Sequence, residues 1–274
     1  MTQTLQVGPL MLSYALLLAL SALATGSFAG QHTGRRVGVD VEPLLWRLLL
    51  VGAIAARLTF VVQFHEAYLK APLDILDLRD GGWTPLAGIA VAGASALVAG
   101  IRRVALRKPL GAAAGIASVV WLLGTATLAT LFDTSGSLPA LRLQALTGAS
   151  VVLTDFHGKP TVVNLWATWC PPCRREIPIL QAAQAERTDV NFVFLNQGEA
   201  AAQVQSYLNG QKLVLQNVLL DARGEAAAEL GHRALPTTLF FDASGRLIDT
   251  RVGELSRATL AQRLAALSTP SRSS

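Results

Sequence analysis

Residues 160–173 read PTVVNLWATWCPPC and hold both cysteines of this 274-residue chain, Cys170 and Cys173. The first part, residues 160–166, is a short apolar run rich in β-branched side chains, which is typical of a buried strand. Residues 174–187 follow with apolar side chains at helical spacing. The stretch therefore predicts a strand, a tight turn and a helix that begins at a cysteine.

The predicted position of Cys170 gives its sulfur particular chemistry. The first amides of a helix have no partner inside the helix, and the helix dipole places partial positive charge there. Both effects stabilise a thiolate at Cys170, which makes this residue the expected nucleophile. Cys173 lies one turn further on, where it can resolve a mixed disulfide formed at Cys170. The motif predicts a redox site.

Two other uses of the C-x-x-C spacing fit the rest of the sequence poorly. A structural zinc site takes four ligands, but the chain has no second cysteine pair and its four histidines are scattered. A structural disulfide across two residues closes a very small loop and constrains the unfolded chain little. We therefore expect no metal and no cofactor at this site.

The rest of the C-terminal half alternates between predicted strands and helices. This alternation, followed by a hairpin, predicts an α/β fold with a mixed sheet and helices on both faces, in one domain over residues 141–270. Ser256 is a plausible N-cap of the last helix. Further strands are expected at 190–195, 217–220, 237–241 and 246–252, and helices at 199–208, 224–230 and 256–267.

Two blocks of this half resemble the TlpA-like (ResA/CcmG-type) thiol–disulfide oxidoreductases, which have a thioredoxin fold. The first is residues 158–178, and the second is residues 235–246, which read LPTTLFFDASGR. In that family the proline equivalent to Pro236 forms a cis peptide bond beside the cysteines. The resemblance implies that Leu235 presents its backbone to an extended client segment next to Cys170.

The residues around the cysteines complete the site that this resemblance implies. Trp169, Pro171 and Pro172 are expected to support client binding. Thioredoxin itself has a buried aspartate at the position of Asn164, and that carboxylate helps to move protons to and from the resolving cysteine. Asparagine is common there in the TlpA-like group, so the proton acceptor for Cys173 stays open. Glu176 is the nearest candidate in sequence, and the alternative is that it is a first-turn acid favoured by the helix dipole.

The N-terminal half has the composition of a membrane domain. Its four apolar stretches, residues 7–29, 44–64, 85–101 and 109–132, are each near the ~20 residues that span a bilayer. We expect an all-α, four-helix transmembrane domain over residues 1–132, followed by a linker over residues 133–140. A cleaved signal peptide over residues 1–30 is less consistent with the sequence, because its start lacks Lys and Arg and its apolar stretch is long.

The charges of the loops predict the orientation of these spans. Basic residues mark cytoplasmic loops, and they occur after the first stretch (Arg35 and Arg36) and after the third, within residues 102–108. We therefore expect both chain ends, and Cys170, in the periplasm of a bacterium with the spans in its inner membrane, where protein disulfides persist. The formal charge of +5 is spread over both halves and does not indicate nucleic-acid binding.

The membrane half is similar to the N-terminal part of bacterial prolipoprotein diacylglyceryl transferase. The similarity covers residues 55–61, 72–76 and 81–88. The essential histidine of the transferase falls at Leu86, and its later arginine–asparagine motif has no counterpart here. The resemblance implies a degenerate module without transferase activity. Within it, Arg57 is a candidate lipid contact, or has a structural partner inside the helix bundle.

These features together predict a membrane-anchored thiol–disulfide oxidoreductase that reduces client proteins. A disulfide oxidase or isomerase would use the same site, and the Pro171–Pro172 pair does not fix the direction by inspection. A transmembrane electron conduit is disfavoured because the apolar stretches contain no cysteine and no histidine. A lipid-modifying transferase is disfavoured by Leu86. Reducing power is expected from a membrane-bound dithiol donor such as a DsbD-type protein, and the client is left open between apocytochrome c, a copper-site thiol and a damaged periplasmic protein.

Overall fold

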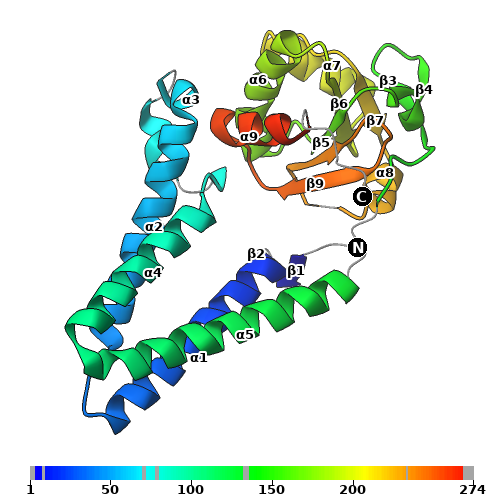
Figure 1. Ribbon diagram of the computed structural model, residues 1–274. Coiled ribbons are helices and arrows are strands. Elements are labelled where there is room, and N and C mark those ends of the chain that lie inside the picture. Colours follow the sequence, from blue (N-terminus) through cyan, green and yellow to red (C-terminus); the bar gives the residue numbers. More distant parts are fainter. Residues whose placement is uncertain are drawn as a thin grey trace. The chain divides into compact units, whose positions relative to one another are not determined.

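The computed structural model describes residues 4–7, 10–69, 72–77, 80–131, 136–232 and 234–267. The chain forms two compact units, one of residues 66–81 and 134–274 and the other of residues 2–65 and 82–133. The first contains the two cysteines and is called the redox unit. The second contains the long apolar helices and is called the helical unit (Figure 1).

The redox unit is built on one mixed β-sheet with the strand order β4-β3-β7-β6-β5-β8-β9 (Figure 1). Strands β5, β6 and β7 run parallel, whereas β3 and β8 are antiparallel to their neighbours. This sheet agrees with the α/β fold predicted above. The strands are β3 (Arg142–Ala145), β4 (Ser150–Val152), β5 (Thr161–Trp166), β6 (Asn191–Gln197), β7 (Val218–Asp221), β8 (Thr237–Phe241) and β9 (Leu247–Val252).

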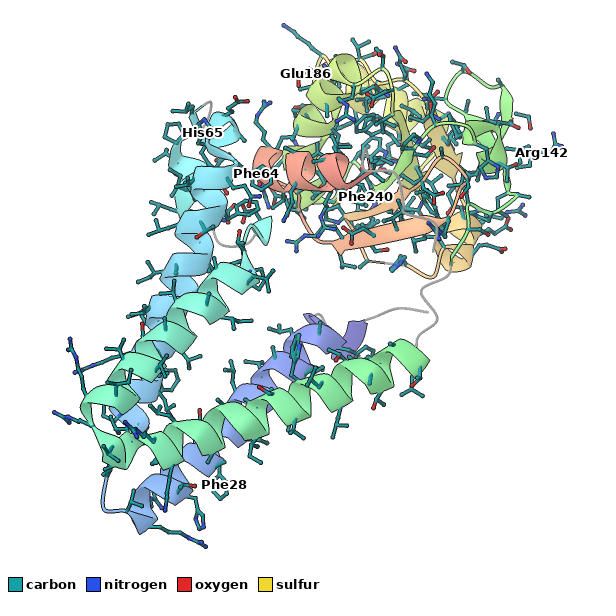
Figure 2. All side chains as sticks on the ribbon, in the orientation of Figure 1. Phe28, Phe64, His65, Arg142, Glu186 and Phe240 are labelled. Carbon is teal, nitrogen blue, oxygen red and sulfur yellow. A yellow bond between two sulfur atoms is a disulfide. The ribbon has the colours of Figure 1, made fainter. Side chains whose placement is uncertain are left out.

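Helices cover both faces of this sheet. Val162 and Phe240 lie in an apolar cluster with residues of α6, α7 and α9, and Phe240 is only 1% exposed (Figure 2). Val163 and Leu239 point to the opposite face, because side chains alternate along a strand, and pack with residues of α8. The helices are α6 (Pro171–Glu186), α7 (Ala201–Gly210), α8 (Glu225–Glu229) and α9 (Arg257–Leu267), with a 3-10 turn, η4 (Leu153–Phe156).

Most predicted boundaries of the redox unit agree with the structure. At the last helix, the predicted N-cap Ser256 accepts a hydrogen bond from the backbone N–H of Thr259 at 3.2 Å. Two features differ from the prediction. The helix expected from Glu199 begins only at Ala201, because the carboxylate of Glu199 binds groups at the ends of β5 and β6 instead. The hairpin β3–β4 was not predicted, and it adds two strands to one edge of the sheet.

The redox unit also includes a short segment that lies in the sequence between α2 (Glu42–Gln63) and α4 (Pro85–Arg102). This segment contains most of α3 (His65–Leu69) and a 3-10 helix, η1 (Pro72–Leu76). Asp80 near its end is buried. Its carboxylate accepts hydrogen bonds from the hydroxyl of Tyr68 at 3.2 Å and from that of Ser256 at 3.1 Å. The segment is therefore tied to the start of α9.

The helical unit contains four helices that are long and apolar enough to cross a membrane. Their outward side chains are large and apolar, and Phe28, for example, is 73% exposed (Figure 2). The first predicted stretch is helical only from Tyr14, because Thr4–Val7 (β1) and Leu10–Ser13 (β2) pair as antiparallel strands. The helices are α1 (Tyr14–Arg36), α2 (Glu42–Gln63), α4 (Pro85–Arg102) and α5 (Arg107–Leu131), which follows a short 3-10 turn, η3 (Val104–Leu106).

Small residues set the pairing of these helices. Helix α1 lies along α5 and α2 lies along α4 (Figure 1). A Cβ atom on Gly26 would lie 2.7 Å from the carbonyl oxygen of Ala113, so α1 and α5 touch at the backbone. A Cβ on Gly88 would lie equally close, at 2.7 Å, to the carbonyl oxygen of Gly52. Both pairs depend on residues without side chains at these contacts.

Candidate active site

The two cysteines lie where the central strand β5 passes into helix α6. The backbone N–H of Cys170 donates to the carbonyl of Ala167 at 3.3 Å, which closes the turn between the two elements. Cys170 is the N-cap of α6 and forms a disulfide with Cys173. Both cysteines are buried, but Trp169 beside them is 65% exposed and Pro171 is exposed too. The strand, turn and helix agree with the sequence prediction.

The two prolines change the hydrogen bonding that the sequence predicted for Cys170. Pro171 and Pro172 occupy the first two positions of α6, and proline has no backbone N–H. The N–H of Cys173, at the third position, donates to the sulfur of Cys170 at 3.3 Å. The amides at the second and third helical positions normally reach an N-cap side chain. Here only the amide of Cys173, at the third position, is present.

Glu176 lies one helical turn after Cys173 and is fully buried. Its Oε1 accepts a hydrogen bond from Nδ2 of Asn164 at 2.7 Å, and its Oε2 accepts one from the N–H of Leu255 at 3.0 Å. Burial raises the pKa of Glu176 to about 7, although the two hydrogen bonds act in the opposite direction. Glu176 is therefore not a solvated acid at the helix start but a buried group that titrates near neutral pH.

The loop before β8 supplies the second sequence block of the site. The Leu235–Pro236 peptide bond is cis, as the resemblance implied. Leu235 packs against the apolar cluster that includes both cysteines. The carbonyl of Pro236 accepts a hydrogen bond from Gly253 at 2.9 Å, which holds this loop to the chain after β9. The contact of Pro236 with the sulfur of Cys170 stays a prediction.

Glu199 is a residue of this region that the sequence analysis missed. It follows β6 and is 4% exposed. Its carboxylate accepts hydrogen bonds from the backbone N–H and the hydroxyl of Thr168, in the turn that leads to Cys170. A polar run, residues 196–199, at the carboxyl end of the strand next to β5 was the signal that could have indicated it.

In the part of the chain that the structure describes, no group of three or more His, Cys, Asp and Glu side chains could hold a metal ion. The reactive groups of this site are its two sulfur atoms. A dithiol at Cys170 and Cys173 can pass two electrons to a disulfide, and the disulfide present here can accept two electrons from a dithiol.

Arg57 and Leu86, which the sequence analysis singled out in the N-terminal half, both lie in the helical unit. Arg57 is buried, donates to the carbonyl of Gly82 at 2.7 Å, and lies 6.0 Å from the ring centre of Trp83. Leu86 is 79% exposed. The structural partner that the sequence left open for Arg57 is thus present, and its contact with lipid stays a prediction.

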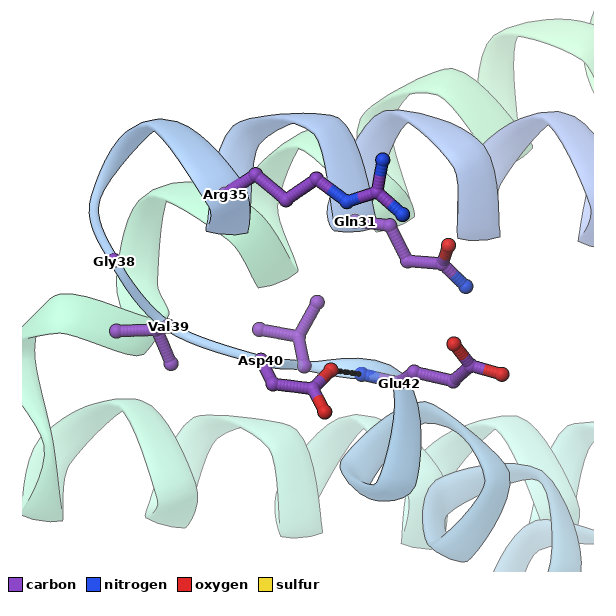
Figure 3. A pocket seen from close by; sticks show the side chains of 7 residues that line it. Gln31, Arg35, Gly38, Val39, Asp40 and Glu42 are labelled. Carbon is purple, nitrogen blue, oxygen red and sulfur yellow. Dashed lines mark hydrogen bonds between the residues drawn. The ribbon is translucent and has the colours of Figure 1, made fainter.

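A hollow of about 340 Å³ lies at the turn between α1 and α2 (Figure 3). Arg35 and Gln31 of α1 line one side of it, and the carboxylates of Asp40 and Glu42 line the other. Asp40 accepts a hydrogen bond from the N–H of Glu42 at 3.0 Å, which fixes the start of α2. The hollow therefore carries both signs of charge.

Comparison with known proteins identifies the family. The Redoxin family matches residues 134–266. Thioredoxin-like protein YneN of Bacillus subtilis (strain 168) is 33% identical over 132 residues, which are 46% of this chain and 75% of YneN. Thiol-disulfide oxidoreductase ResA of Bacillus thuringiensis subsp. konkukian (strain 97-27) is 30% identical over 121 residues, 43% of this chain and 69% of ResA. The chain belongs to the thioredoxin-like thiol–disulfide oxidoreductases.

A solved structure is similar to part of this oxidoreductase. MTB dsbF, described in its mixed oxidized and reduced forms, is 28% identical, with 48% of this chain and 100% of that chain covered and a TM-score of 0.44. The region of this thioredoxin-like protein that the Redoxin family matches contains the Cys170–Cys173 pair and the Leu235–Pro236 loop.

Proposed function

We propose that this oxidoreductase is anchored in the bacterial inner membrane and reduces disulfides of client proteins in the periplasm. One observation carries the direction: the sulfur of Cys170 receives a single helix amide, that of Cys173. A thiolate is stabilised by such amides, and a dithiol whose thiolate is less stabilised is a stronger reductant. Pro171 and Pro172 withhold two N–H groups from the helix start, so they favour the disulfide form of the pair.

The proposed reaction transfers two electrons from the dithiol to the client. The thiolate of Cys170 attacks one sulfur of the client disulfide, so that a Cys170–client bond forms and the other client sulfur leaves as a thiolate and takes a proton from solvent. Cys173 then loses its proton and attacks the sulfur of Cys170. The second client thiol is released, and the Cys170–Cys173 disulfide seen in the structure remains.

Glu176 is the proposed proton acceptor for Cys173 in the second step. Residues three apart on a helix are neighbours, with about 5–6 Å between their Cβ atoms. The pKa of about 7 lets Glu176 be an ionised base at neutral pH and return the proton later. Asn164 and Leu255 hold the carboxylate at this place from the sheet and from the loop before α9.

Trp169, Pro171, Pro172, Leu235 and Pro236 form the proposed binding surface for an extended client segment. The exposure of Trp169 and Pro171 supports this role, because neighbouring apolar side chains that are exposed together mark interaction sites. The oxidised pair would be reduced again by a membrane-bound dithiol donor of the DsbD type. The client is a protein thiol or disulfide, with apocytochrome c among the candidates.

Two features of the structure support the proposed topology. The basic residues lie in the last turn of α1 (Arg35 and Arg36) and around the turn from α4 to α5, within residues 102–108. The turns that follow α1 and α4 both contribute to one apolar cluster, through Val41 and Leu106 respectively. Both groups of basic residues therefore lie at the same end of the helical unit, as the positive-inside rule requires of residues beside cytoplasmic loops. The connection between α2 and α4 is acidic, and its Asp80 is bonded to Ser256 of the redox unit, which supports a shared periplasmic location.

The helical unit is proposed to be an anchor, related to the N-terminal part of prolipoprotein diacylglyceryl transferase, that has lost transfer chemistry. The resemblance and the exposed Leu86 at the histidine position support this. Arg57, which is bonded to Gly82 inside the unit, is proposed to stabilise the start of α4 and is a weaker candidate for a lipid contact.

The redox state of the pair in living cells tests the proposed direction. Cells that express the full chain are quenched with acid, and free thiols are labelled with a maleimide that adds mass. A reductase should be found mainly as the dithiol, and mainly as the disulfide when the membrane dithiol donor is deleted. A pair that is oxidised in both strains would show that the protein is an oxidase.

A further inference from the structure

The carboxylate of Glu199 accepts hydrogen bonds from several parts of the fold. The backbone N–H of Thr168 and Nδ2 of Asn196 each donate to Oε2 at 2.7 Å. The hydroxyl of Thr168 and Nε2 of Gln203 donate to Oε1, the latter at 2.7 Å. Four donors thus converge on one carboxylate, two on each oxygen, which matches the acceptor capacity of an ionised group.

This carboxylate is buried and, within the described part of the chain, pairs with no lysine or arginine. Burying an unpaired charge is costly unless hydrogen bonds replace its hydration. The four donors supply that replacement, and half of them come from Thr168 alone. More of these bonds therefore come from the turn before the cysteines than from α7, which supplies only that of Gln203.

The local backbone explains how Glu199 reaches this turn. Strands β5 and β6 are parallel, with Trp166 opposite Asn196, so their carboxyl ends meet at one edge of the sheet. Gly198 has a φ of 74°, a conformation that favours glycine, and it turns the chain directly after β6. Glu199 then faces Thr168 instead of entering α7.

We propose that Glu199 is a positioning residue that fixes the Thr168 turn, so that Trp169 and Cys170 are presented to an extended client segment. The turn is fixed at both ends: Glu199 holds Thr168, and the carbonyl of Ala167 holds the N–H of Cys170. Between these points Trp169 is exposed. Glu199 contacts neither sulfur through a hydrogen bond and acts through Thr168.

The test compares two probes that share a leaving group. The reduced full-length protein in detergent reacts with a decapeptide–glutathione mixed disulfide or with glutathione disulfide, and the rates are followed by tryptophan fluorescence. Glu199→Gln replaces one acceptor by a donor group, so we expect about tenfold slower reaction with the peptide probe. Reaction with glutathione disulfide, which lacks an extended peptide segment to align, should stay within twofold of wild type.

Two further variants separate positioning from folding. Thr168→Val removes only the hydroxyl bond and should slow the peptide reaction by about threefold. The double variant should be no slower than Glu199→Gln, because both changes act on one bond network. Glu186→Gln, an exposed glutamate at the end of α6, is the matched control and should react like wild type. Thermal unfolding is recorded for each variant.

The inference is overturned if Glu199→Gln slows both probes equally, if it slows neither, or if the effects of the two substitutions add. Should Glu199→Gln fail to fold, the selective effect of Thr168→Val on the peptide probe decides the matter. The inference rests on client binding at the proposed site but not on its direction. An oxidase would still react with both probes, so failure of the proposed reductase function would be seen separately.

Discussion

Asn164 on the central strand donates a hydrogen bond to Glu176 on the active-site helix, with 2.7 Å between Nδ2 and Oε1. A second bond from the same nitrogen, to Thr238 at 3.0 Å, ties this contact to β8. The pair therefore places a titratable carboxyl group beneath the cysteines and connects it to two strands. The neutral amide holds the carboxylate without adding a second charge to this buried region.

The first prediction concerns the pH dependence of the resolving step. A base accepts a proton only when it is ionised, and Glu176 becomes ionised as the pH rises through about 7. The rate at which Cys173 releases a bound peptide from Cys170 should rise with an inflection near pH 7. Glu176→Gln should remove this inflection and slow the step at pH 8 by roughly 100-fold. Stopped-flow measurements from pH 5 to 9 check this, and an unchanged profile would exclude Glu176 as the acceptor.

The free energy of unfolding should also depend on the protonation of Glu176. Its pKa is raised from the ordinary 4.5 to about 7, so the protonated form is favoured by folding. This contribution is fully present below pH 4.5 and is lost as the pH rises through 7, by about 3 kcal/mol at most. Glu176→Gln does not titrate, so it should gain stability relative to wild type between pH 5 and pH 8. Thermal unfolding in detergent at both pH values measures the difference, and a constant offset would contradict it.

The second prediction assigns roles to the sulfur atoms. Both cysteines are buried, but Cys170 is the N-cap of α6 and lies beside the exposed Trp169, whereas Cys173 lies inside the helix. Cys173→Ala should accumulate mixed disulfides with clients in cells, and Cys170→Ala should not. Non-reducing gels and mass spectrometry of the captured species provide the measurement. Equal capture by the two variants would remove the assignment.

The third prediction tests the effect of the prolines on the redox potential. Pro172→Ala restores an N–H at the second position of α6, where it can donate to a thiolate of Cys170. One such bond, at about 1.4 kcal/mol, should make the potential about 30 mV less negative. Equilibration with a glutathione buffer measures it. Pro178→Ala, a proline within the same helix but beyond the cysteines, is the control and should leave the potential unchanged.

The fourth prediction is the membrane topology. Reporter fusions placed at Ser137 and after Ser274 should report the periplasm, and a fusion after Arg107 should report the cytoplasm. The reason is the location of the basic residues at the end of α1 and around the turn from α4 to α5. Paired alkaline phosphatase and fluorescent protein fusions distinguish the two compartments. A cytoplasmic signal at Ser137 would refute the periplasmic proposal.

The fifth prediction tests the proposal that the helical unit has no transferase chemistry. Leu86→His would introduce a histidine at the position that the proposed relation to the diacylglyceryl transferase assigns to it, but no counterpart of the later arginine–asparagine motif of that enzyme occurs in this sequence. Neither wild type nor the variant should transfer a diacylglyceryl group from labelled phosphatidylglycerol to a lipobox peptide. Transfer by the unmodified chain would mean that the helical unit is itself an enzyme.

The strands and helices that could be predicted from the sequence are those with one or both faces buried along their whole length. Strand β5 is covered on both faces, which demands an unbroken apolar run, and residues 161–166 provide it. The helix at the cysteines and the last helix after Ser256 were predicted for a similar reason, because each buries one regular face. The hairpin β3–β4 was missed because its strands are short and partly exposed, so no strict alternation is visible.

The parts of the site that were missed depend on contacts between distant residues. Glu199 meets Thr168 across 31 positions, and only the register of β5 against β6 brings them together. Glu176 was identified as a candidate, but its burial could not be read from a helix of mixed composition. The first apolar stretch was assigned wholly to a helix because hydropathy alone does not distinguish Leu10–Ser13, which is a strand, from the helix that follows.

The contact between α1 and α5 limits how this chain can vary. Gly26 and Gly30 recur at four-residue spacing, and a Cβ on Gly30 would lie 3.0 Å from that of Ala113. In a set of related chains, the position of Gly26 should accept only glycine, because any Cβ there meets the backbone of α5, and that of Gly30 should accept little beyond glycine or alanine. The outward face of the same helix, where Leu20 is 55% exposed, should exchange freely among large apolar residues. In a saturation library scored by protein abundance, substitutions along α1 should therefore lower abundance at every fourth position. This effect should not depend on the redox activity of the cysteines.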